Sequence, residues 1–164
     1  MNAEMSRIEA GWKQLGELVK QVADAADLNR AGADGWTVKD HLAHIAAWEH
    51  SLLALIQGRD RESAMGLTEV PEGIDNVNEA IRKLHETDTT REALAYFRDT
   101  HAHLIGALGE LSDADLQRPY SHYQSNDPDE MRPVVGWVAG NTYEHYAEHT
   151  AWINQLIRES SAAR

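Results

Sequence analysis

The 164-residue sequence contains no cysteine. This absence excludes disulfide bonds, thiolate zinc sites and a cysteine nucleophile, so nitrogen and oxygen ligands would have to hold any metal ion. The sequence also lacks an apolar run near the ~18 to 20 residues that a membrane helix needs. Its first twenty residues, MNAEMSRIEAGWKQLGELVK, carry charges throughout and lack the apolar segment of a signal peptide. We therefore expect a cytoplasmic protein with no membrane partner.

Clusters of basic residues are missing as well. The chain has 15 Lys and Arg against 27 Asp and Glu, and a formal net charge of −12. Nucleic-acid binding depends on a basic surface that neutralises phosphates, so we expect no nucleic-acid partner. The sequence also has no P-loop, no G-x-G-x-x-G, no G-x-S-x-G elbow and no H-E-x-x-H. The last absence argues against a metalloprotease of the zincin type.

The residues that are present indicate an all-α protein of one domain, residues 1–164. Hydrophobic residues make up 42% and charged residues 26% of the chain, as in ordinary globular proteins. No strand-like alternation is found, and helical periodicity predicts a first helix over residues 3–27. A second begins at Thr37, with Asp40 completing a capping box, and stops near Gly58.

The second half of the chain begins with a polar connection over residues 57–76 and a short helix over 77–86. Thr89 or Thr90 caps a third long helix, and residues 112–115 form a single turn. Residues 118–132 read as a long loop, and Pro133 as the first-turn proline of a last helix that runs to about Glu159. Four amphipathic helices with a crossover between the second and third predict a four-helix bundle.

The last helix carries His145 and His149. Four residues along a helix advance the face by only ~40° and rise ~6 Å, so these two side chains point the same way. They share a stripe with the apolar residues Val134, Val138, Trp152 and Leu156, and we therefore expect both to face the core. Two buried imidazoles need partners, which leaves a metal site or a structural hydrogen-bonded pair.

The second helix offers a third ligand in His41 or His44, which are three residues apart and share a face. Periodicity places His41 nearer the middle of the apolar stripe and so favours it slightly. A set of three histidines from facing helices leaves a coordination position open for water or substrate, as in catalytic metal sites.

Several other residues are weaker candidates. Glu148 leans toward the core edge and can orient an imidazole or act as a general base. His101 of the third helix also projects toward its apolar face, where we expect a hydrogen bond to a carbonyl rather than a metal ion. Aromatic residues that can line a pocket mouth, although packing is their commoner role, are Trp36, Trp48, Tyr120, Tyr123 and Trp137.

Two stretches resemble a known family. Residues 35–49, GWTVKDHLAHIAAWE, together with the H-x-x-x-H of the last helix, resemble the DinB-like superfamily of metal-binding four-helix bundles. Residues 140–149, GNTYEHYAEH, look most like its ClbS/DfsB group. The resemblance implies an up-down-down-up bundle that is frequently dimeric, and a metal triad of His44, His145 and His149. For the second helix we follow the resemblance and choose His44, with His41 as the rival.

The resemblance also implies a function. The superfamily includes thiol-dependent transferases, and the ClbS-like branch is associated with hydrolysis of a reactive electrophile. We expect a metal-dependent hydrolase or thiol transferase that acts on a small electrophilic molecule in detoxification, stress or self-resistance. Zn²⁺ or Ni²⁺ would be the metal, a low-molecular-weight thiol a candidate co-substrate, and Glu148 or His41 the assisting residue. The alternative is a bundle that binds a metal or small ligand without catalysis.

Overall fold

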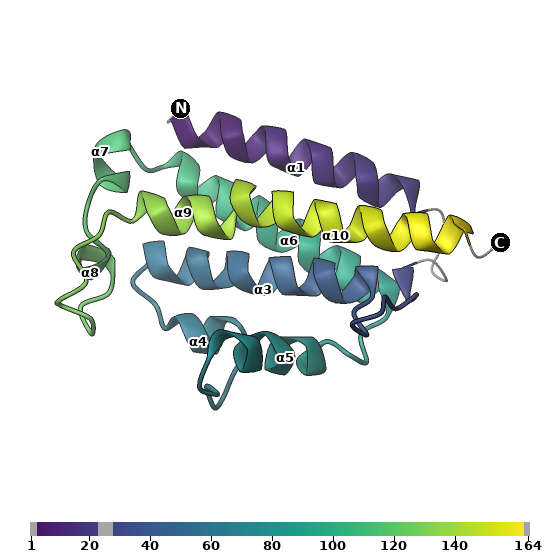
Figure 1. Cartoon of the computed structure of the whole chain (residues 1–164). Helices are drawn as coiled ribbons and strands as arrows, with labels where there is room; N and C mark the ends of the chain where they lie inside the picture. The colour runs from purple at the N-terminus through teal and green to yellow at the C-terminus, as the bar shows by residue number, and fades with distance from the viewer. Residues whose placement is uncertain (1–2, 23–27, 163–164) are drawn as a thin grey trace.

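The computed structural model describes residues 3–22 and 28–162. Four long helices account for most of this part: α1 (Ala3–Gln21), α3 (Val38–Ile56), α6 (Thr90–Gly109) and α10 (Tyr143–Ala162). No strand occurs among the described residues, where only two isolated bridges pair Ala31 with Thr37 and Pro119 with Pro133. The predicted all-α class is therefore confirmed (Figure 1).

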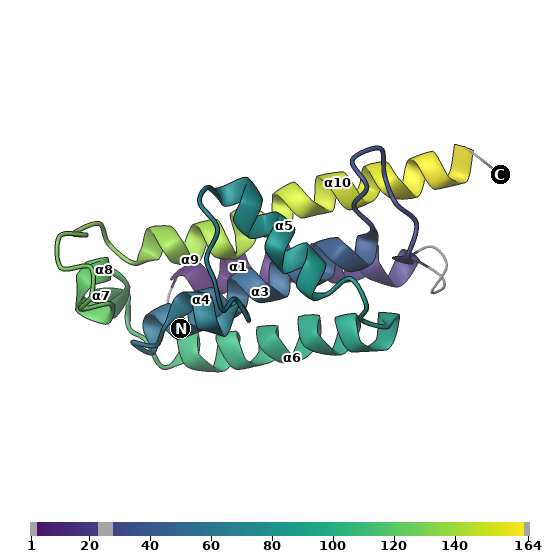
Figure 2. The ribbon, with the colours of Figure 1, turned by 90° about the horizontal axis from the view of Figure 1, so that it is seen from below.

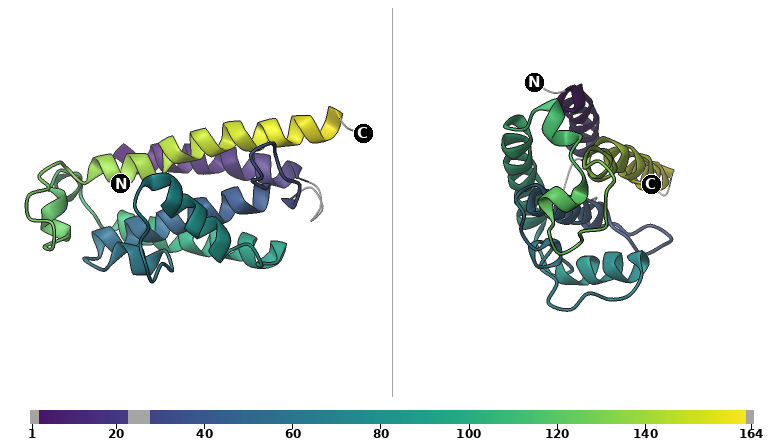
Figure 3. Two further views of the ribbon diagram at one scale, coloured as in Figure 1. Left: turned by 60° about the horizontal axis from the view of Figure 1, so that its bottom comes forward. Right: turned by 90° about the vertical axis from the view of Figure 1, so that its left-hand side faces the viewer.

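The long helices lie side by side. α3 packs along α6, and α1 packs along α10. In Figure 1, α1 and α10 run in one direction, and α3 and α6 run in the opposite one. Seen end-on in the right-hand view of Figure 3, the four helices surround a common centre. α7 (Asp113–Leu116) and α8 (Tyr120–Tyr123) lie near one end of the bundle.

The core follows from the periodicity of these helices. Each contributes large apolar side chains that are fully or almost fully buried at helical spacing. Those that are fully buried include Ile8, Leu15, Leu42, Ile45, Leu52, Leu55, Leu104, Leu108, Tyr146 and Ile153. Because the core runs the length of the bundle, it holds α3 and α10 at a defined separation, and these two helices carry the candidate ligands.

The crossover from α3 to α6 covers the outer face of α3. It contains α4 (Arg61–Ala64) and α5 (Ile74–Leu84), and α5 lies against α3 on the side away from α1 (Figures 1 and 2). Val77 and Ile81 of α5 are buried in a second, smaller apolar cluster with Ala47 of α3. α3 is consequently buried on two faces, one toward the bundle core and one toward the crossover.

The start of α3 is held by two devices. The Thr37 Oγ1 accepts a hydrogen bond from the Asp40 amide at 3.1 Å, and the Asp40 carboxylate accepts one from the Thr37 amide at 2.9 Å. This is the predicted capping box. The ammonium group of Lys39 also donates to the carbonyl oxygens of Glu86 and Asp88, at 2.8 Å each, and so ties the crossover to the helix that carries His44.

Three predicted boundaries differ from the structure. α1 ends at Gln21, and residues 23–27 of the predicted first helix lie outside the described residues. The predicted polar connection contains the turn of α4, and α5 begins at Ile74, three residues earlier than expected. Within the described residues, no helix is long and apolar enough to cross a membrane.

The last helix is broken, which corrects the prediction of one helix from Pro133 to about Glu159. α9 (Val135–Asn141) is followed by its C-cap Thr142, whose backbone leaves the helical region with φ −127° and ψ −109°. The Thr142 hydroxyl donates to the Val138 carbonyl at 2.6 Å, a local bond that competes with the helix ladder. α10 then starts afresh at Tyr143, so His145 and His149 lie in its first turns.

Candidate metal centre

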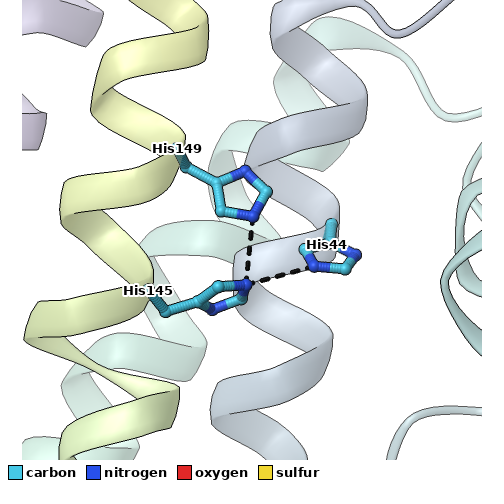
Figure 4. A group of neighbouring side chains, drawn as sticks. All are labelled: His44, His145 and His149. Carbon is cyan, nitrogen blue, oxygen red and sulfur yellow. Dashed lines mark hydrogen bonds between the residues drawn. The ribbon is translucent and has the colours of Figure 1, made fainter. Parts of the chain in front are cut away.

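Three histidines from two helices meet at one point of the structure (Figure 4). α10 carries His145 and His149, and α3 carries His44 on the opposite side. The Nε2 atom of His145 lies 3.1 Å from the Nε2 atom of His44 and 3.0 Å from that of His149. One nitrogen from each of the three rings lies within 4.8 Å of the other two. The structure thus brings together the three residues that the resemblance implied.

The donor set fits a divalent transition metal. Zn–N bonds of about 2.0–2.1 Å at tetrahedral angles place two nitrogen ligands about 3.3 Å apart. The two observed separations, 3.0 and 3.1 Å, are close to this value. Imidazole is a common ligand for Zn²⁺ and Ni²⁺, and three ligands leave further coordination positions open. The described residues therefore include a histidine triad that can hold a metal ion.

Burial keeps these imidazoles neutral, which is the state a metal ligand needs. Burial and the neighbouring His145 and His41 lower the pKa of His44 to about 2. Burial and His41 lower the pKa of His145 to about 4. The pKa of His149 also lies well below its usual value, because the ring is buried and three other histidines surround it. All three rings consequently have a lone pair available at neutral pH.

His41 occupies a different position from the triad. Its Nδ1 atom lies 2.9 Å from Nδ1 of His149, on the edge of that ring away from the converging Nε2 atoms. Burial lowers the pKa of His41 to about 4 although Asp34 and Asp40 oppose the shift. A neutral His41 can accept a hydrogen bond from His149 and so fix the orientation and tautomer of that ring. Periodicity had favoured His41 as the ligand, whereas the structure places His44 with the pair on α10.

The Nδ1 atoms of His44 and His145 differ from Nδ1 of His149 in their hydrogen bonding. The Nδ1 atoms of His44 and His145 are buried and have no hydrogen-bond partner among the described residues. Of the three triad rings, His149 is therefore the one whose orientation is fixed by another side chain, that of His41.

The triad lies in the wall of an open cavity of about 410 Å³. Three tryptophans contact the histidines there: the ring centroid of Trp36 lies 5.3 Å from that of His44, Trp48 lies 6.3 Å from His44, and Trp152 lies 4.8 Å from His149. The remaining side chains of the cavity come from the loop before α3, from α3 itself, from α5 and from α9 and α10, and are Asp34, His41, Ile74, Asn78, Asn141 and Glu148. A small molecule that enters this cavity reaches the triad directly.

The structure places the other predicted residues unequally. Glu148 is exposed and lines the cavity, which suits a base better than a residue that orients a buried ring. Trp152, expected in the core stripe, is 48% exposed and lines the cavity instead. Trp36 and Trp48 line the cavity, but Tyr120 and Trp137 pack against each other elsewhere, with ring centroids 4.7 Å apart. Tyr123 donates a hydrogen bond to the Asp115 carbonyl and likewise lies away from the cavity.

His101 belongs to a separate buried network, and the expected bond to a carbonyl is wrong. Its Nδ1 lies 2.9 Å from the Glu49 carboxylate, which is fully buried and also accepts a hydrogen bond from Tyr146. The ring of His101 stacks on Trp12 with centroids 3.5 Å apart. Burial raises the pKa of Glu49, while His101 and Tyr146 oppose that shift. Sequence patterns missed Glu49, because only the fold shows that its position on α3 faces α6 and α10.

Comparisons with known proteins agree with this architecture. A family model described as the DinB superfamily matches residues 7–153. A solved structure titled Sibling Lethal Factor Precursor – DfsB is similar with a TM-score of 0.69 at 18% identity, over 95% of this chain and 94% of that one. A crystal structure of a protein from Streptococcus pneumoniae has a TM-score of 0.68 at 15% identity, over 94% and 88% of the two chains. A search of curated proteins finds no match.

Proposed function

Since the chain belongs to the DinB superfamily, we propose that it is a metal-dependent enzyme that acts on a small electrophilic molecule. One observation carries the proposal: three neutral imidazoles from α3 and α10 converge beside a cavity of about 410 Å³. Their positions leave the side toward the cavity free for a ligand. His44, His145 and His149 would hold the ion, for which Zn²⁺ and Ni²⁺ are the candidates.

His44, His145 and His149 would hold a divalent ion, which would supply a nucleophile near neutral pH by lowering the pKa of a water or thiol. The protein's own residues have separate tasks. His41 holds the ring of His149 through the 2.9 Å contact between their Nδ1 atoms. Glu148 reaches the cavity with its carboxylate and is the candidate base that accepts the proton of the nucleophile.

Both reactions that the superfamily suggests, hydrolysis and thiol transfer, use a nucleophile of this kind. Trp36 and Trp48 are half-buried and line the cavity. A small electrophile bound against Trp36 and Trp48 would lie next to the triad.

Elemental analysis of protein purified without an affinity tag tests the metal site. Wild type is compared with His145→Ala and His149→Ala, and with His103→Ala, which changes an exposed histidine of α6 as the matched control. We expect about one ion per chain in wild type and control and none in the two triad variants, all with unchanged helical circular dichroism. Stoichiometric metal in the triad variants would refute these ligands, and an absence of metal after incubation with Zn²⁺ and Ni²⁺ would refute the metal enzyme.

Turnover distinguishes catalysis from simple binding. Metal-loaded protein is mixed with an excess of a small electrophile such as an epoxide, with and without added thiol, and product is counted per site. An enzyme forms many product molecules per site, and His149→Ala should abolish this turnover. Product or bound ligand that stops at one per site would instead identify a sequestering protein.

A further inference from the structure

Three tryptophans, Trp36, Trp48 and Trp152, line the cavity. Trp36 lies 5.3 Å from His41 and also from His44, while Trp152 lies 5.9 Å from His41 and 4.8 Å from His149. Trp48 completes the set and is held by a hydrogen bond of 3.2 Å from its indole nitrogen to Asn78. Apolar surface is also exposed at the cavity, in Trp152 and in Ile74 of α5. Exposed apolar surface beside a cavity indicates a ligand with apolar faces of its own.

The charge of the cavity has one sign. Its lining includes the carboxylates of Asp34 and Glu148 and no lysine or arginine. A smaller adjoining cavity of about 170 Å³ shares Asp34, His41 and Trp152, adds Glu159, and also has no basic residue in its lining. The two carboxylates would offset the charge of a divalent ion at the triad, so the cavity does not favour an anion even with metal bound.

We propose that this site takes a flat, largely apolar organic cation as its substrate, bound against Trp36, Trp48 and Trp152 and attracted by Asp34 and Glu148. The faces of tryptophan rings attract cations, and desolvated aromatic cages are a common way to bind quaternary ammonium groups. The inference rests on the proposed function, of which it names the substrate class. It also disfavours an anionic co-substrate such as glutathione, which carries two carboxylates.

A size-matched series of probes tests the preference: trimethyl(2-naphthyl)ammonium, 2-methoxynaphthalene and naphthalene-2-sulfonate. None of them is a strong metal ligand, so binding reports the cavity rather than coordination. Quenching of tryptophan fluorescence and calorimetry give the dissociation constants, at low ionic strength where charge effects are least screened. We expect the cation to bind about 10-fold more tightly than the sulfonate, with the neutral probe between them.

Variants separate charge from stacking. Asp34→Asn and Glu148→Gln should each weaken the cation about 3-fold and leave the neutral probe unchanged. Trp152→Leu should weaken both the cation and the neutral probe about 5-fold. Glu144→Gln, an exposed residue of the same helix that does not line the cavity, is the matched control and should change neither.

The outcomes can be separated from those of the metal experiment, because metal content is measured on the same samples. Stoichiometric metal with equal or tighter binding of the sulfonate would overturn this inference and leave the proposed enzyme intact. A failure of every probe to bind would overturn it as well. If wild type binds no metal after incubation with Zn²⁺ and Ni²⁺ but still prefers the cation, the metal enzyme is overturned and a cation-binding cavity remains.

Discussion

Acidification should destabilise the metal-free protein by an amount that the buried histidines set. His41 and His44 are each 4% exposed, and burial lowers their pKa values to about 4 and about 2. In the unfolded chain both titrate near the ordinary value of about 6.5. Between pH 7.5 and pH 5.0 the unfolded state therefore binds nearly one additional proton at each of these two histidines, whereas the folded state binds almost none. The linkage relation gives about 2 kcal/mol for each histidine.

The sign of this effect follows from the direction of the shifts. A base whose folded pKa is depressed stabilises the fold fully above its unfolded pKa, and this contribution is lost as the pH falls toward the folded pKa. For His41 and His44 together the loss amounts to about 4 kcal/mol at pH 5.0, a large part of the 5 to 15 kcal/mol typical of a domain. The pKa of Glu49 is raised by burial, so its contribution has the opposite sign.

Urea denaturation in the presence of a chelator measures the effect at both pH values. His44→Gln isolates one histidine, and its loss of stability on acidification should be about 2 kcal/mol smaller than that of wild type. His103→Gln, at an exposed position of α6, should behave like wild type. Glu49 contributes equally to all three proteins and cancels in the comparison. If wild type and His44→Gln lost the same stability between pH 7.5 and pH 5.0, the assignment of a buried neutral imidazole would be wrong.

Three further substitutions test separate parts of the structure. His41→Phe removes the group behind His149 and should weaken metal binding about 10-fold in a chelator competition; unchanged affinity would show that the 2.9 Å contact has no positioning role. Thr37→Ala breaks the capping box of α3 and should lower the free energy of unfolding, measured in urea, by about 1 kcal/mol. An unchanged free energy of unfolding would show that this cap is dispensable. His101→Leu leaves the buried Glu49 with fewer partners and should cost about 3 kcal/mol in thermal or urea unfolding, whereas a neutral effect would mean that this carboxyl is satisfied without it.

Local signals in the sequence predicted the starts of α3, α6 and α7 correctly. Thr37, Thr89 and Ser112 each cap a helix through a hydrogen bond to the residue three positions later. Such caps depend on a few neighbouring residues, and this is why they can be recognised without the fold. The break at Thr142 has no equally strong signal, because a threonine within an amphipathic pattern is compatible with an unbroken helix.

The choice between His41 and His44 shows where periodicity fails. An amphipathic pattern assumes one buried face, but α3 is covered by the bundle on one side and by α5 on another. The middle of its apolar stripe is therefore not the direction of the site. Resemblance suggested His44, and the structure brings this residue and not His41 to within 3.1 Å of His145 through Nε2.

By itself, the sequence determined the helical class, the caps of α3, α6 and α7, and the paired direction of His145 and His149, because helix geometry alone relates residues three or four positions apart. Only the tertiary structure decided which residue of α3 meets that pair, that His41 contacts His149, and that Glu49 lies with His101 and Tyr146. It also decided that Trp152 borders a cavity with Asp34 and Asn78. The contact of His41 with His149 joins segments 108 residues apart, and the relative rotation and depth of packed helices set such contacts, which no local pattern encodes.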